Sequence, residues 1–486
     1  MPAIVEKYSS ETRAALCDTI AYRIGNLLQK GLSELMQKKP NFVVILTDDQ
    51  GYQDIGCFGS PLIKTPNLDR MAGEGTRFTS FYTQPICGPS RAALMTGCYP
   101  LRVAERDNIK NVHPVLHSNE ITMAELLKPH GYATAMIGKW DLAGHAPRVT
   151  DILQQDLLPH CRGFDMHFGT PASNDRWART ALLENGRVLE DPIDLTQSTT
   201  RRYADKAIAF MRKHKSEPFF VYLAPNMPHI ELHAGRDFVG RSARGLYGDV
   251  IEELDHAVGM IINELHALDL ARETYLIFAS DNGPWLCKGS HGGSSDPLRS
   301  GKLSTWEGGP RVPCIMWAPG RIPEGKVCHE IATSMDILPT FAELAGVKTP
   351  DDRVIDGRSI LHLLQGRYGE ADPKKNYFYY IRSHLQAVRR EQWKLILARP
   401  EDPVWLAPFS PNTHIAPWDD IGVEKPMLYD LGKDIAETRD VADTYPRVVG
   451  ELLDLAEEAR QDIGDYDRKG AGARFFDDAP PRPDIV

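Results

Sequence analysis

Short apolar runs alternate with amphipathic stretches along most of the chain. The runs cover residues 41–46 (NFVVIL), 133–138 (ATAMIG), 218–225 (PFFVYLAP) and 275–280 (YLIFAS). They are rich in β-branched and aromatic residues, which favour strands. Continuous apolar runs of this length are typical of strands that are buried on both faces of a parallel sheet.

Helical patterns separate these predicted strands. Apolar positions three and four residues apart predict a helix within residues 118–131 and a long helix through residues 245–268. Strands that alternate with helices indicate the α/β class. We therefore expect a large, mostly parallel sheet sandwiched by helices.

Two further regions flank this pattern. Residues 1–38 carry one apolar stripe, from Leu16 to Leu35, and predict a helical extension. This helix either packs on its own domain or serves as a homo-oligomerisation arm. Residues 376–398 predict antiparallel strands with a turn at 389–392, and residues 444–464 predict a helix. We expect three parts, namely a helical extension over 1–38, a main domain over 39–375 and a smaller α+β domain over 376–486.

Composition and charge limit the classes of partner. The chain of 486 residues is 42% hydrophobic and 25% charged, which is globular composition. Its net charge of −10 argues against nucleic acid or an anionic membrane surface as a partner. An anionic substrate would have to be held by local cations against the field of the whole protein.

No segment predicts a membrane span or a leader peptide. No run reaches the ~18 uninterrupted apolar residues of a membrane helix. The first twenty residues have no apolar core or cleavage site of a secretory signal, so we expect a cytoplasmic protein. Eight scattered cysteines without CxxC pairs argue against a zinc site or a disulfide framework.

Polar residues follow each of the four predicted strands. Ligands of open α/β sheets bind outside the carboxyl ends of the strands, so we expect these polar residues to converge on one site. Oxygen donors among them favour a hard cation such as Ca²⁺ or Mg²⁺. The polar residues at the four strand ends are Asp48 and Asp49, Lys139 and Asp141, Asn226 and His229, and Asp281 and Asn282.

A cysteine stands at the head of a predicted helix in PICGPSRAALMTG, residues 85–97. Arg91 follows Cys87 one helical turn later. A helix N-terminus stabilises a thiolate, so a nucleophilic thiol is one interpretation and an inert buried thiol is another. No histidine lies near Cys87 in the sequence to act as its base.

The run Cys-x-Pro-Ser-Arg at residues 87–91 resembles the signature of type I sulfatases, which belong to the alkaline-phosphatase-like superfamily. Residues 45–83 and 280–313 resemble the family's two metal-binding segments, the second of which includes its downstream lysine motif. Residues 137–144 are similar to its Gly-Lys-Trp-His motif, and two segments within 387–441 are similar to its C-terminal domain. The resemblance implies an alkaline-phosphatase-like fold and hydrolysis of sulfate esters.

The resemblance also implies how the site works. Cys87 would be oxidised to formylglycine by a separate formylglycine-generating enzyme, so its thiol is a precursor and not the nucleophile. One hydroxyl of the hydrated aldehyde would attack sulfur, and proton loss from the other would release sulfate. Arg91 would orient the site, and Lys139 and Lys302 would stabilise charge on the sulfuryl oxygens. One Ca²⁺, with Mg²⁺ the less favoured ion, is expected on Asp48, Asp49, Cys87, Asp281 and Asn282.

Two positions depart from the family's pattern. Its Lys-Trp-His motif ends here in Asp141, and its His-x-Pro motif begins here with Asn226. We expect Asp141 to act as the base and Asn226 to contact substrate. The acid that protonates the leaving group is then sought among the histidines near these motifs. We favour His229 and keep His291, His145 and His233 as alternatives, and we also place His291 at the substrate.

An insert in the C-terminal domain suggests the substrate. Residues 399–426 are rich in proline and also carry Trp405, His414 and Trp418. Aromatic faces with polar tips suit sugar rings, so we interpret the insert as a substrate-binding lid, with an interdomain packing loop as the alternative. The expected substrate is a sulfated oligosaccharide or polysaccharide. The alternatives are an aryl sulfate, a phosphonate or phosphodiester, or a binding role without catalysis.

Overall fold

The structure, a computed structural model, describes residues 39–103, 115–144, 155–172, 180–195, 197–369, 376–381, 383–399 and 422–474. The chain divides into two units, residues 1–40 and 41–486. The elements described below belong to the second unit. The predicted helical extension over 1–38 lies outside the described residues, so its proposed role in oligomerisation stays a prediction.

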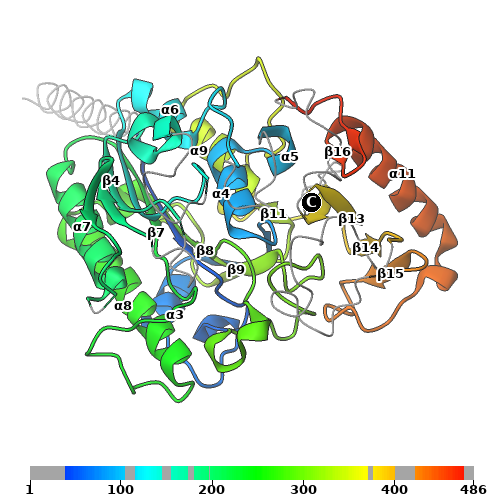
Figure 1. Ribbon diagram of the computed structural model, residues 1–486, viewed down its shortest axis with the longest axis horizontal. Helices are drawn as coiled ribbons and strands as arrows, with labels where there is room; N and C mark the ends of the chain where they lie inside the picture. The colour runs from blue at the N-terminus through cyan, green and yellow to red at the C-terminus, as the bar shows by residue number, and fades with distance from the viewer. Residues whose placement is uncertain are drawn as a thin grey trace, which may run out of the picture. The chain divides into compact units, whose positions relative to one another are not determined.

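A large, mostly parallel sheet forms the centre of the second unit (Figure 1). β1 (Asn41–Thr47) pairs in parallel with β7 (Phe219–Ala224) on one side and β8 (Thr274–Ser280) on the other, and β3 (Ala133–Lys139) pairs with β7. The described strands follow the order β10-β2-β9-β8-β1-β7-β3-β4-β5-β6, with β11 beside β2. The other bounds are β2 (Thr76–Tyr82), β4 (Met166–Thr170), β5 (Leu182–Glu184), β6 (Arg187–Glu190), β9 (Arg311–Trp317), β10 (Lys326–Cys328) and β11 (Ala332–Thr333).

Both faces of this sheet are buried because the side chains of each central strand alternate between two cores. In β1, Phe42, Val44 and Leu46 join one hydrophobic cluster, while Val43 and Ile45 join the other. This alternation is the period of two that strand geometry imposes. The apolar run predicted as a doubly buried strand is therefore confirmed.

Helices cover the two faces (Figure 1). The cluster that contains Val43 and Ile45 also receives buried residues of α3, α7 and α8, and the cluster that contains Phe42 receives those of α4, α6 and α9. The bounds are α3 (Pro66–Gly73), α4 (Cys87–Thr96), α5 (Pro100–Val103), α6 (Met123–Leu127), α7 (Thr199–Lys213), α8 (Leu246–Ala267), α9 (Ile337–Ala345) and α10 (Leu361–Leu364). Among the described helices, none combines the length and hydropathy that a membrane span requires.

A second, antiparallel sheet follows from residue 376. Its order is β12 (Asn376–Ile381), β13 (His384–Arg390), β14 (Trp393–Ile396) and β15 (Met427–Asp430). α11 (Pro446–Asp462) packs its buried Leu452, Leu455 and Ala456 against the sheet's hydrophobic cluster. The predicted α/β fold with a smaller antiparallel domain and one helix is confirmed, and the turn between β13 and β14 falls where the sequence places it.

Two local details add to the sequence predictions. The helix expected within residues 118–131 is short, because α6 ends at Leu127 and a 3-10 turn over Lys128–His130 precedes Gly131, whose φ is +87°. Pro129 cannot donate a hydrogen bond within that turn, and glycine takes the left-handed conformation easily. β9 was not predicted from the sequence. It lies between β8 and β2 and pairs with both in the antiparallel direction.

Candidate active site

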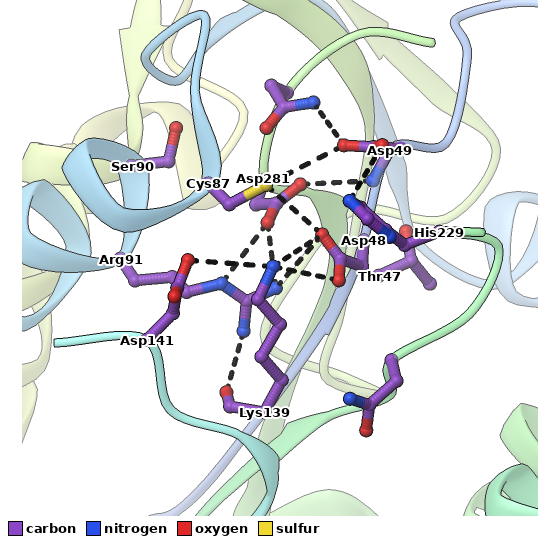
Figure 2. Close-up of polar contacts among 12 residues, drawn as sticks. Thr47, Asp48, Asp49, Cys87, Ser90, Arg91, Lys139, Asp141, His229 and Asp281 are labelled. Carbon is purple, nitrogen blue, oxygen red and sulfur yellow. Dashed lines mark hydrogen bonds and ion pairs between the residues drawn. The ribbon is translucent and has the colours of Figure 1, made fainter. Parts of the chain in front are cut away.

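Two neighbouring carboxylates lie where β1 ends. Asp48 and Asp49 are buried, and the φ of Asp49 is +66°. Adjacent strand residues point to opposite faces, but this left-handed turn directs both carboxylates into one site (Figure 2). Aspartate tolerates this conformation better than most residues do, which is why the turn can occur here.

Cys87 lies at the first position of α4, beside these carboxylates. Its Sγ lies 3.3 Å from Oδ1 of Asp48 and 3.7 Å from Oδ1 of Asp49. The turn from β2 into α4 is closed by Ser90, whose Oγ accepts from the amide of Gln84 and donates to its carbonyl, both at 2.8 Å. Ser90 points away from the acids in Figure 2, so this motif serine shapes the turn that presents residue 87.

Arg91 ties α4 to the end of β8. Its Nη2 and Nε donate to Oδ2 of Asp281 at 2.7 and 3.1 Å, and its Nη1 donates to the carbonyl of Lys139 at 2.7 Å. The guanidinium is fully buried, so its charge needs these partners. Arg91 therefore joins three segments, α4, β3 and β8, at one point (Figure 2).

Two lysines pair with the two carboxylates. Nζ of Lys139 lies 2.9 Å from Oδ2 and 3.0 Å from Oδ1 of Asp48. Nζ of Lys302 lies 2.8 Å from each carboxylate oxygen of Asp49. The local cations that an anionic substrate requires are thus present within this buried cluster.

The electrostatics of the cluster follow from burial and these charges. Burial opposes ionisation of Asp48 and Asp49, but the nearby cations, above all Lys139 and Lys302, hold the pKa of each below its usual value. Burial and the charge of Asp48 raise the pKa of Asp281. The nearby cations therefore stabilise the ionised carboxylates of Asp48 and Asp49 more than that of Asp281.

The thiol of Cys87 has the opposite behaviour from a thiolate nucleophile. Burial, and then the negative charge of Asp281, raise its pKa well above the ordinary value. The thiol is therefore protonated at neutral pH, in spite of its place at a helix N-terminus. This finding disfavours the interpretation of Cys87 as a nucleophilic thiolate.

His229 is the histidine that lies at the cluster. It is buried, and its Nε2 lies 3.6 Å from Oδ2 of Asp49. Its Nδ1 lies 2.6 Å from the carbonyl of Ile230, an acceptor, so Nδ1 carries a proton and donates it. Nε2 is consequently the ring atom that faces the site, as Figure 2 shows.

Asp141 also faces the site. Its φ is +61°, and its Oδ2 lies 3.6 Å from Nζ of Lys139, the lysine two residues earlier (Figure 2). Gly138 permits this arrangement of β3, since a Cβ there would meet the carbonyl oxygen of Ala224 at 1.9 Å. The departure from the family's histidine thus places a carboxylate beside Lys139.

The donor set fits a divalent cation. One ligand atom from each of Asp48, Asp49, Cys87 and His229 lies within 4.8 Å of the others. Asp281 and Asn282 adjoin them, because Oδ1 of Asp281 accepts from the amide of Asp49 and Nδ2 of Asn282 donates to Oδ1 of Asp49. Oδ1 of Asn282 is buried without a hydrogen-bond partner among the described residues, as expected for an oxygen that faces an ion.

The other predicted site residues have different surroundings. Asn226 is buried, and its amide binds Tyr203 and Thr170 at 2.9 Å each, which makes it part of the scaffold. His291 is exposed, and His233 is half-buried. Contacts of Asn226 and His291 with substrate stay predictions. His145, Trp405, His414 and Trp418 lie outside the described residues.

One aromatic residue at the site was not predicted from the sequence. Trp285 follows Asp281 and Asn282, and its ring lies 4.3 Å from Nζ of Lys302 and 5.4 Å from the ring of His229. A tryptophan in a polar loop just beyond a predicted ligand pair is the signal that could have found it.

Comparisons with known proteins agree with this fold. The family model for sulfatases matches residues 40–347, and the model for the C-terminal region of aryl-sulfatase matches residues 372–475. An N-acetylgalactosamine-6-sulfatase from Canis lupus familiaris is 39% identical over 382 residues, which cover 73% of this chain and 71% of that protein. A steryl-sulfatase from Mus musculus is 33% identical over 523 residues, with 87% and 82% covered.

A solved structure from Bacteroides thetaiotaomicron, whose description concerns the metabolism of multiple glycosaminoglycans, is also similar. Its TM-score is 0.72 at 29% identity, and the match covers 87% of this chain and all of that one. The fold therefore has known counterparts in sequence and in structure.

Proposed function

The chain belongs to the sulfatase family, within the alkaline-phosphatase-like superfamily, and is a sulfuric ester hydrolase; from this premise we propose that it cleaves sulfate esters of a carbohydrate through a formylglycine at residue 87. The observation that carries the proposal is the position of Cys87 at the start of α4. It lies against Asp48 and Asp49, whose carboxylates bind Lys139 and Lys302.

The relatives support a carbohydrate substrate. One of them is named for a sulfated amino sugar, and the structural neighbour is described in connection with glycosaminoglycans. The steryl-sulfatase relative shows that an apolar alcohol is also compatible with this family. An aryl or steryl sulfate is therefore the second candidate substrate, and the assay below distinguishes the two.

We propose Ca²⁺ as the resident ion, held by Asp48, Asp49, Asp281 and Asn282 with residue 87. All-oxygen donors of this kind suit a hard cation. Such an ion, when bound, would lower the pKa of a hydroxyl group at residue 87. Lys139 and Lys302 would then be released in part from the carboxylates to hold the sulfuryl oxygens.

The residues of the chain carry the remaining steps. An oxygen of the hydrated aldehyde at residue 87 bonds to sulfur while the bond from sulfur to the ester oxygen breaks. His229 gives a proton from Nε2 to that departing oxygen, which leaves as an alcohol. Asp141 takes the proton of the second hydroxyl, the aldehyde C=O reforms, and the bond from carbon to the sulfate oxygen breaks. Water then restores the hydrate.

The test is sulfate release by the full chain produced together with a formylglycine-generating enzyme, in the presence of Ca²⁺. We expect turnover on sulfated amino sugars, loss of activity on chelation, and recovery on adding Ca²⁺ back. Peptide mass spectrometry should find an aldehyde at residue 87, and Cys87→Ala should be inactive. Equal activity from protein with an intact Cys87 thiol would contradict the proposal. Preference for aryl or steryl sulfate, or for an aryl phosphonate, would reassign the substrate.

A further inference from the structure

A short 3-10 segment, η7 (Leu286–His291), lies beside the active site and follows Trp285 directly. The chain runs from Asp281 and Asn282 through Pro284 to this segment. The carbonyl of Pro284 accepts a hydrogen bond from the amide of Lys302 at 2.9 Å. The start of η7 is thus hydrogen-bonded to the loop that carries Lys302.

The far end of η7 is also anchored. Arg244, just before α8, donates to the carbonyls of Ser290 and Gly292 at 3.2 and 2.9 Å. A segment held at both ends presents its side chains in a fixed arrangement, which lowers the entropy lost when a ligand binds. The side chains of η7 next to the site are therefore a preorganised surface.

One of these side chains, Lys288, has an unusual charge environment. Its amide donates to the carbonyl of Trp285 at 3.0 Å, so the two residues stand one 3-10 turn apart and on the same side. Nζ of Lys288 lies 4.1 Å from the centre of the Trp285 ring. Within the described ranges, no carboxylate forms an ion pair with Lys288, although its side chain is only half-exposed.

The same indole also contacts the active site. Nζ of Lys302 lies 4.3 Å from the centre of the Trp285 ring, and the ring of His229 lies 5.4 Å from it. The separation of the two ammonium groups therefore cannot exceed the sum of 4.1 and 4.3 Å. Lys302 is neutralised by Asp49, whereas the positive charge of Lys288 is not balanced in this way.

We propose that Lys288, held on Trp285, is a second anion subsite that binds a further carboxylate or sulfate of the same sugar substrate. The inference rests on the proposed carbohydrate function and narrows it to substrates with two anionic groups. A single sugar or two linked sugars can place two such groups within this short span. The rest of the protein carries net negative charge, so a locally unpaired cation at the site selects for a dianionic ligand.

The test measures binding, by calorimetry, to the full chain with its unmodified Cys87 thiol and with Ca²⁺, because the matured chain would hydrolyse the probes during the titration. The probes are glucosamine 6-sulfate, glucosamine 2-N,6-O-disulfate, and a disaccharide of an unsaturated uronate with N-acetylgalactosamine 6-sulfate. We expect at least one of the dianionic probes to bind more tightly than the monosulfate. The disulfate and the uronate arms distinguish a sulfate from a carboxylate as the second group.

Lys288→Ala should weaken the tighter dianionic probe by about tenfold or more, the usual size of a hydrogen bond to a charged group. It should leave the monosulfate and turnover of 4-nitrophenyl sulfate unchanged. Lys288→Arg should keep the preference, and Trp285→Phe should keep more of it than Trp285→Ala. Lys348→Ala, which removes an exposed lysine paired with Asp351, is the matched control for net charge.

Two results would overturn the subsite. One is equal affinity of the wild-type protein for monoanionic and dianionic probes. The other is an equal loss for all probes in Lys288→Ala, which would mean that Lys288 acts through Lys302. Neither depends on catalysis, because binding is the readout. Absence of sulfate release from every substrate would instead contradict the proposed function.

Discussion

At the scale of single residues, the proposed role of the Asp141 carboxylate as a base can be tested directly. It lies beside Lys139 at the position where the family's motif has histidine. If Asp141 accepts the proton that collapses the hydrate, Asp141→Asn should still transfer sulfate to residue 87 but fail to release it. We expect one burst of product per active site and no further turnover. Rapid-mix assays with 4-nitrophenyl sulfate and intact-mass detection of sulfated protein check this. Steady turnover without a burst would assign the base elsewhere.

His229 can be separated from a purely metal-binding residue by the choice of leaving group. A nitrophenol leaves without much help, whereas a sugar hydroxyl needs a proton. His229→Gln should therefore slow sugar sulfate cleavage by about 10²–10⁴-fold, the range for general acid catalysis, and largely spare 4-nitrophenyl sulfate. Calcium content, measured on the same samples, should not change. An equal loss on both substrates, with loss of calcium, would identify Nε2 of His229 as a metal ligand. His256→Gln, at an exposed position of α8, is the control.

At the scale of elements, the turn from β2 into α4 is the part most open to a direct test. Ser90→Ala removes both hydrogen bonds to Gln84 and leaves its buried backbone amide and carbonyl without that partner. We expect stability to fall by about 1–3 kcal/mol, the cost of unsatisfied buried groups. Denaturant unfolding of protein with unmodified Cys87 measures this. Thr96→Val, which deletes a hydroxyl bonded only within α4, should be milder. Comparable losses in both variants would argue against a special role for the turn.

The helices and strands also show how much of the structure the sequence patterns could predict. The ends of β1, β3 and β8 were predictable, because a doubly buried strand must end where polar residues begin, and Asp48, Lys139 and Asp281 stand at those points. Contacts between distant segments were not predictable. Lys302 meets Asp49 across 253 residues of sequence, and no local pattern reports such a distance. The choice of His229 among the histidines, and the place of Trp285, likewise depend on how loops meet.

At the scale of the whole second unit, a buried charge network joins the C-terminal sheet to the loop that carries Lys302. Nζ of Lys394, on β14, lies 3.1 Å from Oε1 of Glu307 and 2.7 Å from Oε1 of Glu437, and donates to the carbonyl of Thr305 at 2.8 Å. Glu307 and Thr305 follow Lys302 closely in the chain. The C-terminal sheet therefore supports the position of Lys302, a role for this domain that does not require the insert.

This network predicts a pH-dependent stability. Burial, with the nearby charge of Glu307, raises the pKa of Glu437 from 4.5 to about 7 in spite of Lys394. The folded protein then holds a proton on Glu437 that the unfolded chain releases near pH 4.5. This contribution to stability is complete below that pH and is lost as pH rises to about 7. The free energy of unfolding of the wild-type protein should therefore fall, relative to that of Glu437→Gln, across this window.

Denaturant midpoints of the wild-type protein and of Glu437→Gln, measured from pH 4 to pH 8, test the prediction, because the difference between the two curves cancels the titration of all other groups. Glu458→Gln, a change at an exposed position of α11, is the control and should follow the wild-type curve. Parallel curves for the wild-type protein and Glu437→Gln would show that Glu437 titrates at the same pKa in the folded and the unfolded protein, which would contradict the prediction. A fall of the wild-type stability relative to that of Glu437→Gln as pH rises would show that, below about pH 7, the network favours one negative charge. That charge is on Glu307, whose pKa the surrounding cations hold below its usual value despite burial. In that case the ion pair of Glu307 with Lys394 is what holds the C-terminal sheet to the loop of Lys302 below about pH 7.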